Sequence, residues 1–217
     1  MQIHQSTPAT DLLDAMGWDL ASAYERANFE TAFNYFVAKV PLDVLNEEVR
    51  ASAWIPFSCP LPGPTEQSRA AFAQRANPHE ATPHRRIREA EPVKATKIMT
   101  WLQAIDFTSR VDPDYCLHPG DIVKRFRKPN HQQFEGGKWY TTPDGKLEEL
   151  ALPKGLYSPD YYVVNTSFRC LRTKASDVLI TWIRTHDANR YSKGGGTQLF
   201  IYSKFACPRC LSPATRG

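Results

Sequence analysis

The chain has 217 residues, of which 41% are hydrophobic and 23% charged, and its formal net charge is +4. This length predicts one domain, or one domain with an extension, and the composition excludes a fibrous chain or one that is disordered throughout. The basic excess is smaller than that of a dedicated nucleic-acid binder, so nucleic acid is a disfavoured partner. No apolar run approaches the ~20 residues of a membrane span and no signal peptide is recognisable, so we expect a cytoplasmic protein without membrane association.

The first segment, residues 1–58, has the pattern of a helical region. Apolar residues recur at helical spacing from Asp11 to Val40, which predicts two helices, or one helix bent near its start. Pro41 ends this run because its ring and missing N–H cannot continue a helix, and a short helix around Leu45 is expected to follow. Aromatic residues at helical spacing normally pack, so we expect those of this segment to lie in the core.

Residues 59–94 are rich in proline and polar residues and contain few apolar anchors. This composition predicts a linker or a long loop. Its basic cluster from His84 to Arg88 is interpreted as a solvated charged face or, alternatively, as a surface that contacts phosphates. The apolar spacing from Ala95 to Phe107 then predicts another helix.

After Asp112 the pattern changes to short β-prone segments that are separated by turn signals. A helical half followed by a β-rich half, without regular βαβ alternation, predicts an α+β fold. We expect residues 95–206 to form the β-rich domain and residues 207–217 to form a tail. The predicted strands are Ile122–Phe126, Lys138–Thr142, Tyr161–Asn165, Val178–Arg184 and Leu199–Ser203.

The five cysteines are odd in number and scattered along the chain, which predicts free thiols rather than a disulfide framework. Cys207 and Cys210 form a C-x-x-C pair that could supply two thiolates to zinc. No second C-x-x-C is present, and the pair lies close to the end of the sequence. A structural zinc ion at Cys207 and Cys210 and an inert or oxidation-prone tail are therefore alternative interpretations. The further zinc ligands would be drawn from Cys116, His118, Cys170 or His186.

The most informative segment is the run of glycines from Gly194 to Gly196, which leads into a predicted strand that carries Gln198. Glycines without Cβ atoms allow the backbone to approach a ligand closely. The alternative is a flexible hairpin loop. Phosphate-binding, dinucleotide-binding, zinc-protease and serine-hydrolase signatures are absent from the sequence.

Further motifs in the same half resemble the tuberculosis necrotizing toxin family of NAD glycohydrolases. The family pattern PGT-x-[IV]-x-R-[FY] corresponds to residues 119–126, and its G-x-[FY]-x-[SA]-P-x-G-T-P segment corresponds to residues around 137–145. The Ala-Leu-Pro of an R-A-L-P-P segment lies at 151–153, and the G-G-G-x-Q of a closing G-G-G-x-Q-[YF] lies at 194–198. The resemblance spans about Leu117 to Tyr202.

This resemblance implies an ADP-ribosyltransferase-like fold with a split β-sheet. It also implies an enzyme that consumes NAD as its substrate and needs no metal. It also implies a toxin, secreted as an effector without a conventional signal peptide, and neutralised by a cognate immunity protein. Leu150 stands where the family has an arginine, and Tyr162 stands where it has a histidine. The residues implied to be catalytic are Gln198, Arg125 and Tyr162, and those implied to bind NAD are Arg125, Trp139, Tyr140, Thr142, Gly195 and Gly196.

The residue chemistry is compatible with cleavage of the nicotinamide–ribose bond. The nicotinamide nitrogen of NAD is cationic while it is bonded to ribose, so nicotinamide departs as a neutral molecule. No general acid is therefore needed, and positioning of the reacting groups can suffice. The Gln198 amide can accept a hydrogen bond from a ribose hydroxyl, and Arg125, with Lys124 or Arg127 close by, can bind the diphosphate. Strand alternation allows only one of Trp139 and Tyr140 to face the pocket. Glu148 or Glu149 is a candidate replacement for the missing histidine, although exposed turn charges are the simpler interpretation of both.

We therefore expect the glycine run to bring Gln198 beside Arg125 in a cleft for NAD, with hydrolysis or ADP-ribosyl transfer as the reaction. One alternative is a non-enzymatic module that binds an anionic partner, either nucleic acid or an acidic protein. Its binding residues would be the basic segments His84–Arg88 and Lys124–Lys128. Another alternative is a catalytically inactive relative that is used for protein binding.

Overall fold

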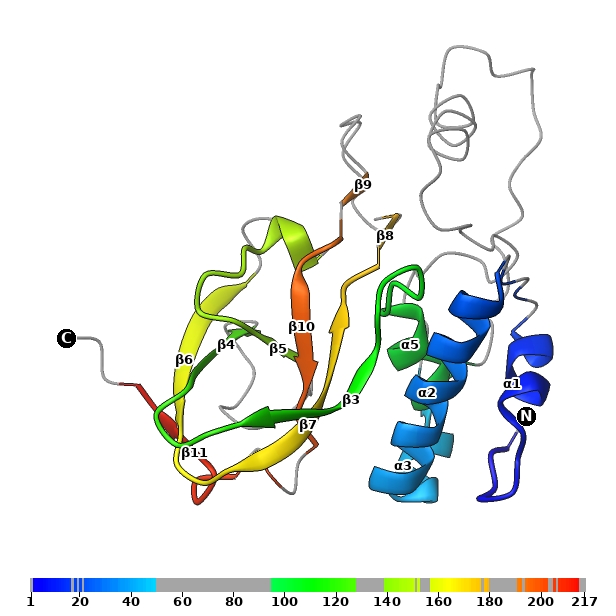
Figure 1. Cartoon of the computed structure of the whole chain (residues 1–217), viewed down its shortest axis with the longest axis horizontal. Coiled ribbons are helices and arrows are strands. Elements are labelled where there is room, and N and C mark those ends of the chain that lie inside the picture. The colour runs from blue at the N-terminus through cyan, green and yellow to red at the C-terminus, as the bar shows by residue number, and fades with distance from the viewer. Residues whose placement is uncertain are drawn as a thin grey trace, which may run out of the picture.

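The computed structural model describes residues 2–49 except 17, 19 and 21, and then residues 95–127, 139–150, 152, 157–176, 178–179, 191–192, 194–202, 205 and 207–214. The α-helices lie together at one end of the molecule, and a curled sheet forms the other end (Figure 1). The helices are α1 (Ala9–Ala15), α2 (Ala23–Lys39), α3 (Leu42–Asn46), α5 (Lys97–Gln103) and the short 3-10 helix η2 (Glu148–Leu150). The strands are β1 (Glu48–Val49), β2 (Ala95–Thr96), β3 (Asp112–Leu117), β4 (Ile122–Arg127), β5 (Trp139–Thr141), β6 (Ser158–Val164), β7 (Phe168–Lys174), β8 (Val178–Leu179), β9 (Tyr191–Ser192), β10 (Thr197–Phe200) and β11 (Leu211–Pro213).

The longest helix, α2, begins at a cap that the sequence supplies. The side-chain oxygen of Ser22 accepts a hydrogen bond from the backbone N–H of Glu25 at 3.1 Å, and the Glu25 carboxylate accepts one from the N–H of Ser22 at 2.8 Å. This reciprocal pair satisfies N–H groups near the helix start that have no partner within the helix. The helix ends at Lys39, just before Pro41, as the sequence predicts.

Helix α2 packs its aromatic side chains into the core that joins the helices to the sheet. Phe36 meets Phe200 of β10 edge to face, with ring centroids 4.9 Å apart, and Phe29 packs on Phe107 at 5.3 Å. Burying one such side chain contributes about 1.5–3 kcal/mol. The expectation that these aromatic residues form core is therefore confirmed.

A buried asparagine, Asn28, connects α2 to the segment that leads into β3. Its Nδ2 donates to the carbonyl oxygens of Phe107 at 2.9 Å and Ser109 at 3.0 Å, and its Oδ1 accepts from the N–H of Val111 at 3.3 Å. A polar side chain buried without partners would destabilise the fold, whereas this one satisfies three backbone groups. It thereby fixes the position of the helices relative to the sheet.

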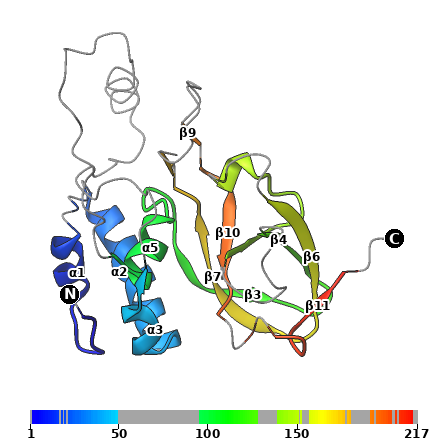
Figure 2. The same ribbon diagram turned by 180° about the vertical axis from the view of Figure 1, so that it is seen from behind.

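The main sheet has seven strands in the order β11-β6-β4-β5-β10-β7-β3, and every described pair of neighbours is antiparallel. Leu117 of β3 and Leu211 of β11 lie on the two edge strands of the sheet. Both nevertheless belong to one apolar cluster, together with Tyr162 of β6. The sheet therefore curls around an interior of its own (Figure 2). Its outer face at Phe200 and Leu171 packs on the helices.

The α+β class is confirmed, with helices preceding the large antiparallel sheet. The prediction of two helices between Asp11 and Val40 is confirmed by α1 and α2. The segment from Ala95, which was expected to be helical, begins as β2 and becomes helical only at Lys97. The strands β3, β7 and β11 were not predicted. Residues 207–217 were expected to be a tail, whereas Leu211–Pro213 forms β11 on the edge of the main sheet.

Several sequence predictions fall on residues outside the described ranges. They include the linker at 59–94, its basic cluster from His84 to Arg88, and the end of the strand expected at Val178–Arg184. The proposed division of the chain into four segments stays a prediction. Among the described residues, the helices are too short or too polar to cross a membrane.

Candidate functional site

The strand register places a row of polar residues across four neighbouring strands of the sheet. Gln198 of β10 lies opposite Thr141 of β5 on one side and Thr173 of β7 on the other, and Thr141 lies opposite Lys124 of β4. Directly opposed residues of antiparallel strands project from the same face. We call Lys124, Thr141, Gln198 and Thr173 the polar row. Phe200, two residues beyond Gln198, packs on the helices, so the row lies on the helix-facing side of the sheet.

All four side chains of the polar row are buried. The Thr141 hydroxyl donates to the carbonyl oxygen of Thr197 at 2.6 Å. The Thr173 hydroxyl has no hydrogen-bond partner among the described residues. Four buried polar side chains in one line are unusual on a sheet face that packs on an apolar helical layer, because each needs a partner to offset its desolvation. This row is the first feature that sets the candidate site apart from ordinary core.

Gln198 is held in a fixed orientation by two backbone carbonyls. Its Nε2 donates to the carbonyl oxygen of Ala104, at the end of α5, at 2.7 Å and to that of Lys174 at 3.3 Å. Its Oε1 accepts no hydrogen bond from the described part of the chain. The side chain is only 5% exposed. Gln198 therefore both links the sheet to α5 and presents a positioned acceptor oxygen.

Lys124 supplies a buried cation at the β4 end of the polar row. Its Nζ donates to the carbonyl oxygen of Pro143 at 2.6 Å and lies 5.4 Å from the ring centroid of Phe126 and 5.5 Å from that of Tyr161. The residue is 7% exposed. Two aromatic faces and a carbonyl stabilise the ammonium without neutralising it. The site therefore retains a positive charge that an anionic ligand could use.

The turn after β5 lies beside this cation. The N–H of Gly145 donates to the carbonyl oxygen of Thr142 at 3.0 Å, which closes the turn. The Thr142 side chain hydrogen-bonds Asp144 and lowers the pKa of that carboxyl, and the charge of Lys124 lowers it further by a smaller amount. Asp144 is therefore ionised at neutral pH. Its side chain is exposed to solvent, whereas Thr142 is half-buried.

Arg125 lies on the opposite face of the sheet from the polar row. It is the residue after Lys124, and adjacent residues of a strand project to opposite faces. Its guanidinium carbon lies 5.9 Å from the ring centroid of Tyr140, inside the curled sheet, and the residue is 4% exposed. Tyr140 in turn meets Tyr162 edge to face at 5.8 Å. Arg125, Tyr140 and Tyr162 therefore form one interior cluster.

Both tyrosines of this cluster are neutral phenols at physiological pH. Burial raises the pKa of Tyr140 to about 12, although the nearby charge of Arg125 and a hydrogen bond with it act in the other direction. Burial also raises the pKa of Tyr162. Neither phenol can serve as a base near pH 7, because a base must lose its proton readily at the working pH.

The expected pairing of Gln198 with Arg125 does not occur. The structure brings Arg125 and Tyr162 together in the sheet interior and places Gln198 on the helix-facing side, with Lys124 on its row. Shifting the register by one residue moves a side chain to the other face, and the sequence alone does not set the register between β4 and β10. Tyr161, rather than Tyr162, projects to the same face as Gln198, because it pairs with Lys124.

Trp139 and Tyr140 project to opposite faces, as strand alternation requires. Tyr140 faces Arg125, whereas Trp139 packs edge to face on Phe200 at 5.2 Å beside the helical core. Sequence alternation predicts that only one of these two aromatic residues faces the pocket, and the structure shows that Trp139 packs against the helical core.

The glycine run is packed closely against the rest of the protein. A Cβ atom on Gly194 would lie 2.2 Å from the carbonyl oxygen of Ala175, and one on Gly196 would lie 2.7 Å from Cβ of Glu149. The N–H of Gly195 donates to Ala175 and that of Gly196 to Glu149, so these N–H groups are already bonded within the protein. Only Gly195, with φ of +89° and open space around it, is free of such packing.

The carboxylates that follow the turn after β5 lie on η2. The Glu149 carboxylate accepts a hydrogen bond from the N–H of Lys146 at 3.3 Å, and its backbone carbonyl accepts from Gly196. Glu149 is half-buried and Glu148 is exposed. η2 thus joins the turn after β5 to the glycine run at one end of the sheet.

The basic segment that starts at Lys124 does not form an open charged surface in the part of it that the structure describes. Lys124 and Arg125 are buried on opposite faces, and Arg127 forms an ion pair with Asp160. Lys128 lies outside the described ranges. Phosphate-driven binding of nucleic acid needs exposed cations, so this segment gives little support to the non-enzymatic alternative.

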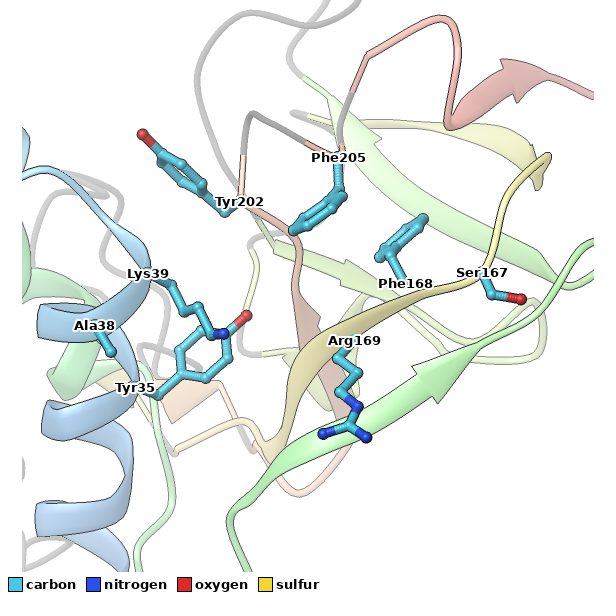
Figure 3. A pocket seen from close by; sticks show the side chains of 8 residues that line it. All are labelled: Tyr35, Ala38, Lys39, Ser167, Phe168, Arg169, Tyr202 and Phe205. Carbon is cyan, nitrogen blue, oxygen red and sulfur yellow. The ribbon is translucent and has the colours of Figure 1, made fainter.

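A cleft of about 550 Å³ lies elsewhere, between α2 and the start of β7 (Figure 3). Its volume is in the range of small-molecule sites. The rings of Phe168 and Phe205 stack at 5.2 Å on one side of it, and Lys39 lines it from α2. None of the site residues predicted from the sequence is among the described residues that line this cleft: Tyr35, Ala38, Lys39, Ser167, Phe168, Arg169, Tyr202 and Phe205.

The described cysteines, Cys116, Cys170, Cys207 and Cys210, are free thiols, as the sequence predicts. Within the described ranges no three His, Cys, Asp or Glu side chains come together in a way that could hold a metal ion. Among the residues suggested as further zinc ligands, those that the structure describes therefore do not lie close enough to Cys207 and Cys210 to complete a metal site.

No family model matches the chain, and no curated protein matches it significantly. Among solved structures, a chain of the structure of Tse6 in complex with Tsi6 is similar, with 18% identity and a TM-score of 0.41 over 70% of this chain and 96% of that one. A chain of the complex of Rhs1-CT with its cognate immunity protein RhsI1 is similar with 21% identity and a TM-score of 0.33, over 51% of this chain and 83% of that one.

Proposed function

We propose that the protein cleaves the nicotinamide–ribose bond of NAD and that Gln198 orients the ribose. The observation that carries this proposal is the geometry of the Gln198 amide. Two backbone carbonyls hold its Nε2, while its Oε1 accepts no hydrogen bond from the described residues. An amide oxygen held in this way can accept from a ribose hydroxyl without losing side-chain freedom when the substrate binds.

Such a site can promote the reaction by position and charge alone. Nicotinamide departs as a neutral molecule and leaves positive charge on the ribose, so the reaction requires no proton for the leaving group. Fixing the ribose and one water in reacting geometry supplies the entropic part of the acceleration. An amide oxygen carries partial negative charge, so the Gln198 oxygen would also stabilise the positive charge that develops on the ribose. No base is needed among the buried tyrosines.

Lys124 is the residue that would bind the diphosphate. It is a buried cation on the same face as Gln198, and two strand spacings of roughly 4.8 Å each separate their positions on the polar row. Three of the segments that resemble the toxin family supply β4, β5 and β10, which are neighbours in the sheet. Arg125 on the other face supports Tyr140, so its contribution is to the fold of the sheet interior.

The proposal includes the biological setting that the resemblance implies. The protein would act as a toxin that depletes NAD, would reach its target as an effector without a conventional signal peptide, and would be held inactive by a cognate immunity protein. Expression of the chain in bacteria should then be toxic, and Gln198→Leu should relieve the toxicity.

Nicotinamide release from NAD by the purified protein tests this function. Wild type should release nicotinamide, and the Gln198→Leu variant should lose most of this activity at a temperature well below its unfolding midpoint. Gln103→Leu is a matched control, because it makes the same replacement on α5, where the side chain has no hydrogen bond to another described residue. Free ADP-ribose as co-product indicates hydrolysis, and ADP-ribose attached to protein indicates transfer.

Two results would contradict the proposal. Equal nicotinamide release by wild type and Gln198→Leu would remove Gln198 from the site. Absence of release at micromolar enzyme, with NAD still bound, would instead favour the catalytically inactive relative.

A further inference from the structure

Cys207 and Cys210 face each other across a tight turn. The N–H of Cys210 donates to the carbonyl oxygen of Cys207 at 2.9 Å, which closes a four-residue β-turn with Pro208 and Arg209 at its centre. The Sγ atoms of the two cysteines are 3.6 Å apart and in hydrogen-bonding contact. Both residues are partly exposed. A reagent in solution can therefore reach a pair of thiols that already touch.

The backbone of this turn meets the requirements of a disulfide. The first and last Cα atoms of a β-turn lie within about 7 Å, and disulfides bridge Cα atoms about 4.4–6.8 Å apart. Closing the gap between the sulfur atoms to a bond of about 2.05 Å requires side-chain rotation rather than movement of strands. Pro208, whose φ is fixed by its ring, holds the turn in place during that rotation.

We propose that Cys207 and Cys210 form a reversible disulfide by exchange with a low-molecular-weight disulfide such as glutathione disulfide. This modification site is independent of NAD cleavage. It also gives a function to the C-x-x-C pair, for which the described residues supply no further metal ligand.

The surroundings of the two thiols indicate which one reacts first. Burial raises the pKa of Cys207, but hydrogen bonds from Cys210 and the charge of Arg209 outweigh this effect and lower it. Burial raises the pKa of Cys210, and the adjacent Cys207 raises it further. Because the thiolate is the nucleophile, Cys207 attacks and Cys210 resolves.

The exchange balances in two steps. The Cys207 thiolate attacks one sulfur of glutathione disulfide, the glutathione S–S bond breaks, and one glutathione leaves as a thiolate that takes up a proton. Cys210 then loses its proton and attacks the Cys207 sulfur, which releases the second glutathione and forms the intramolecular disulfide. The protein loses two electrons and two protons, and glutathione disulfide is reduced to two glutathione thiols.

Oxidation would lock the turn that starts β11. The N–H of Leu211 donates to the carbonyl oxygen of Cys207 at 2.8 Å, and the carbonyl oxygen of Cys210 accepts from the N–H of Asn165 at 2.8 Å. Leu211 is fully buried in the interior cluster of the sheet. The redox state of this pair would therefore affect how firmly β11 is held on the edge of β6.

The test uses the full chain, equilibrated in buffers of defined ratios of glutathione to glutathione disulfide, with free thiols then blocked by iodoacetamide. Trypsin cleaves after Arg209, between the two cysteines, so the peptides 205–209 and 210–216 stay joined only if the disulfide has formed. We expect a joined species two hydrogen masses lighter than the sum of its reduced peptides, and its reversal by excess glutathione. Cys116→Ser, which removes a partly buried thiol on β3, is the matched control and should leave the result unchanged.

Single variants test the order of attack. Cys210→Ser should accumulate a stable glutathione adduct on Cys207, whereas Cys207→Ser should form its adduct on Cys210 several times more slowly at neutral pH. Faster adduct formation on Cys210 would overturn the order. Separate alkylated peptides at every glutathione ratio would overturn the disulfide, as would stoichiometric zinc binding that protects both thiols in the wild-type protein.

Discussion

Replacing Gln198 by leucine should destabilise the fold as well as the reaction, and the size of the effect follows from its hydrogen bonds. The substitution removes two neutral donors, each contributing about 0.5–1.5 kcal/mol. The acceptors do not lose all their partners, since Ala104 also accepts from the N–H of Ser176 at 3.0 Å and Lys174 from the N–H of Asp106 at 2.9 Å. We therefore expect the lower part of the summed range, about 1–2 kcal/mol.

This loss of free energy of unfolding corresponds to a decrease in Tm of about 2–8 °C for a chain of this size. Scanning calorimetry of wild type, Gln198→Leu and Gln103→Leu measures it, and chemical denaturation supplies an independent value. Gln103→Leu should stay within about 0.5 kcal/mol of wild type. If Gln198→Leu has the same Tm as Gln103→Leu, the hydrogen bonds from Nε2 to Ala104 and Lys174 do not anchor the side chain, and the inference that they orient its Oε1 is refuted.

Three further perturbations test the fold around the site. Asn28→Leu removes three buried hydrogen bonds to the segment beginning at Phe107 and should destabilise the protein by about 2–4 kcal/mol, measured by urea denaturation; a loss below 0.5 kcal/mol would contradict this. Gly196→Ala should destabilise by about 1–3 kcal/mol, because its Cβ would lie 2.7 Å from that of Glu149, and an unchanged Tm would show that the glycine run is loosely packed. Burial raises the pKa of Tyr140 from 10.0 to about 12, so Tyr140 ionises at lower pH in the unfolded state than in the folded state. The free energy of unfolding should therefore fall by up to about 1.4 kcal/mol per pH unit between about pH 10 and 12, more steeply than in Tyr140→Phe. Parallel pH profiles of the two proteins would refute the raised pKa.

The sequence predicts the helical half well, because its signals are local. The helical spacing and Pro41 lie within the segment that they organise, and the aromatic core on α2 follows from spacing alone. The strand β7 was missed because Leu171 faces the helices while Cys170 faces the sheet interior. A strand buried on both faces lacks the simple alternation that sequence analysis detects.

The predictions about the site depend on contacts between distant segments, and these are where sequence reasoning fails. Alternation within β4 shows that Lys124 and Arg125 project to opposite faces, but only the register with β5 and β10 shows which of them shares a face with Gln198. The close packing of Gly196 depends on Glu149, which lies far away in the sequence. Local chemistry identified Gln198, whereas the position of its neighbours required the fold.

The affinity for NAD of Lys124→Met and of Arg125→Lys tests the central claim most directly, because the two residues are adjacent in sequence and on opposite faces. A charge-assisted hydrogen bond contributes about 1.5–3 kcal/mol, so the account predicts that Lys124→Met weakens NAD binding by roughly tenfold to a hundredfold in titration calorimetry. Arg125→Lys should bind NAD within about threefold of wild type. The opposite order, with NAD binding lost in a folded Arg125→Lys and retained in Lys124→Met, would contradict the assignment of the site to the helix-facing side of the sheet.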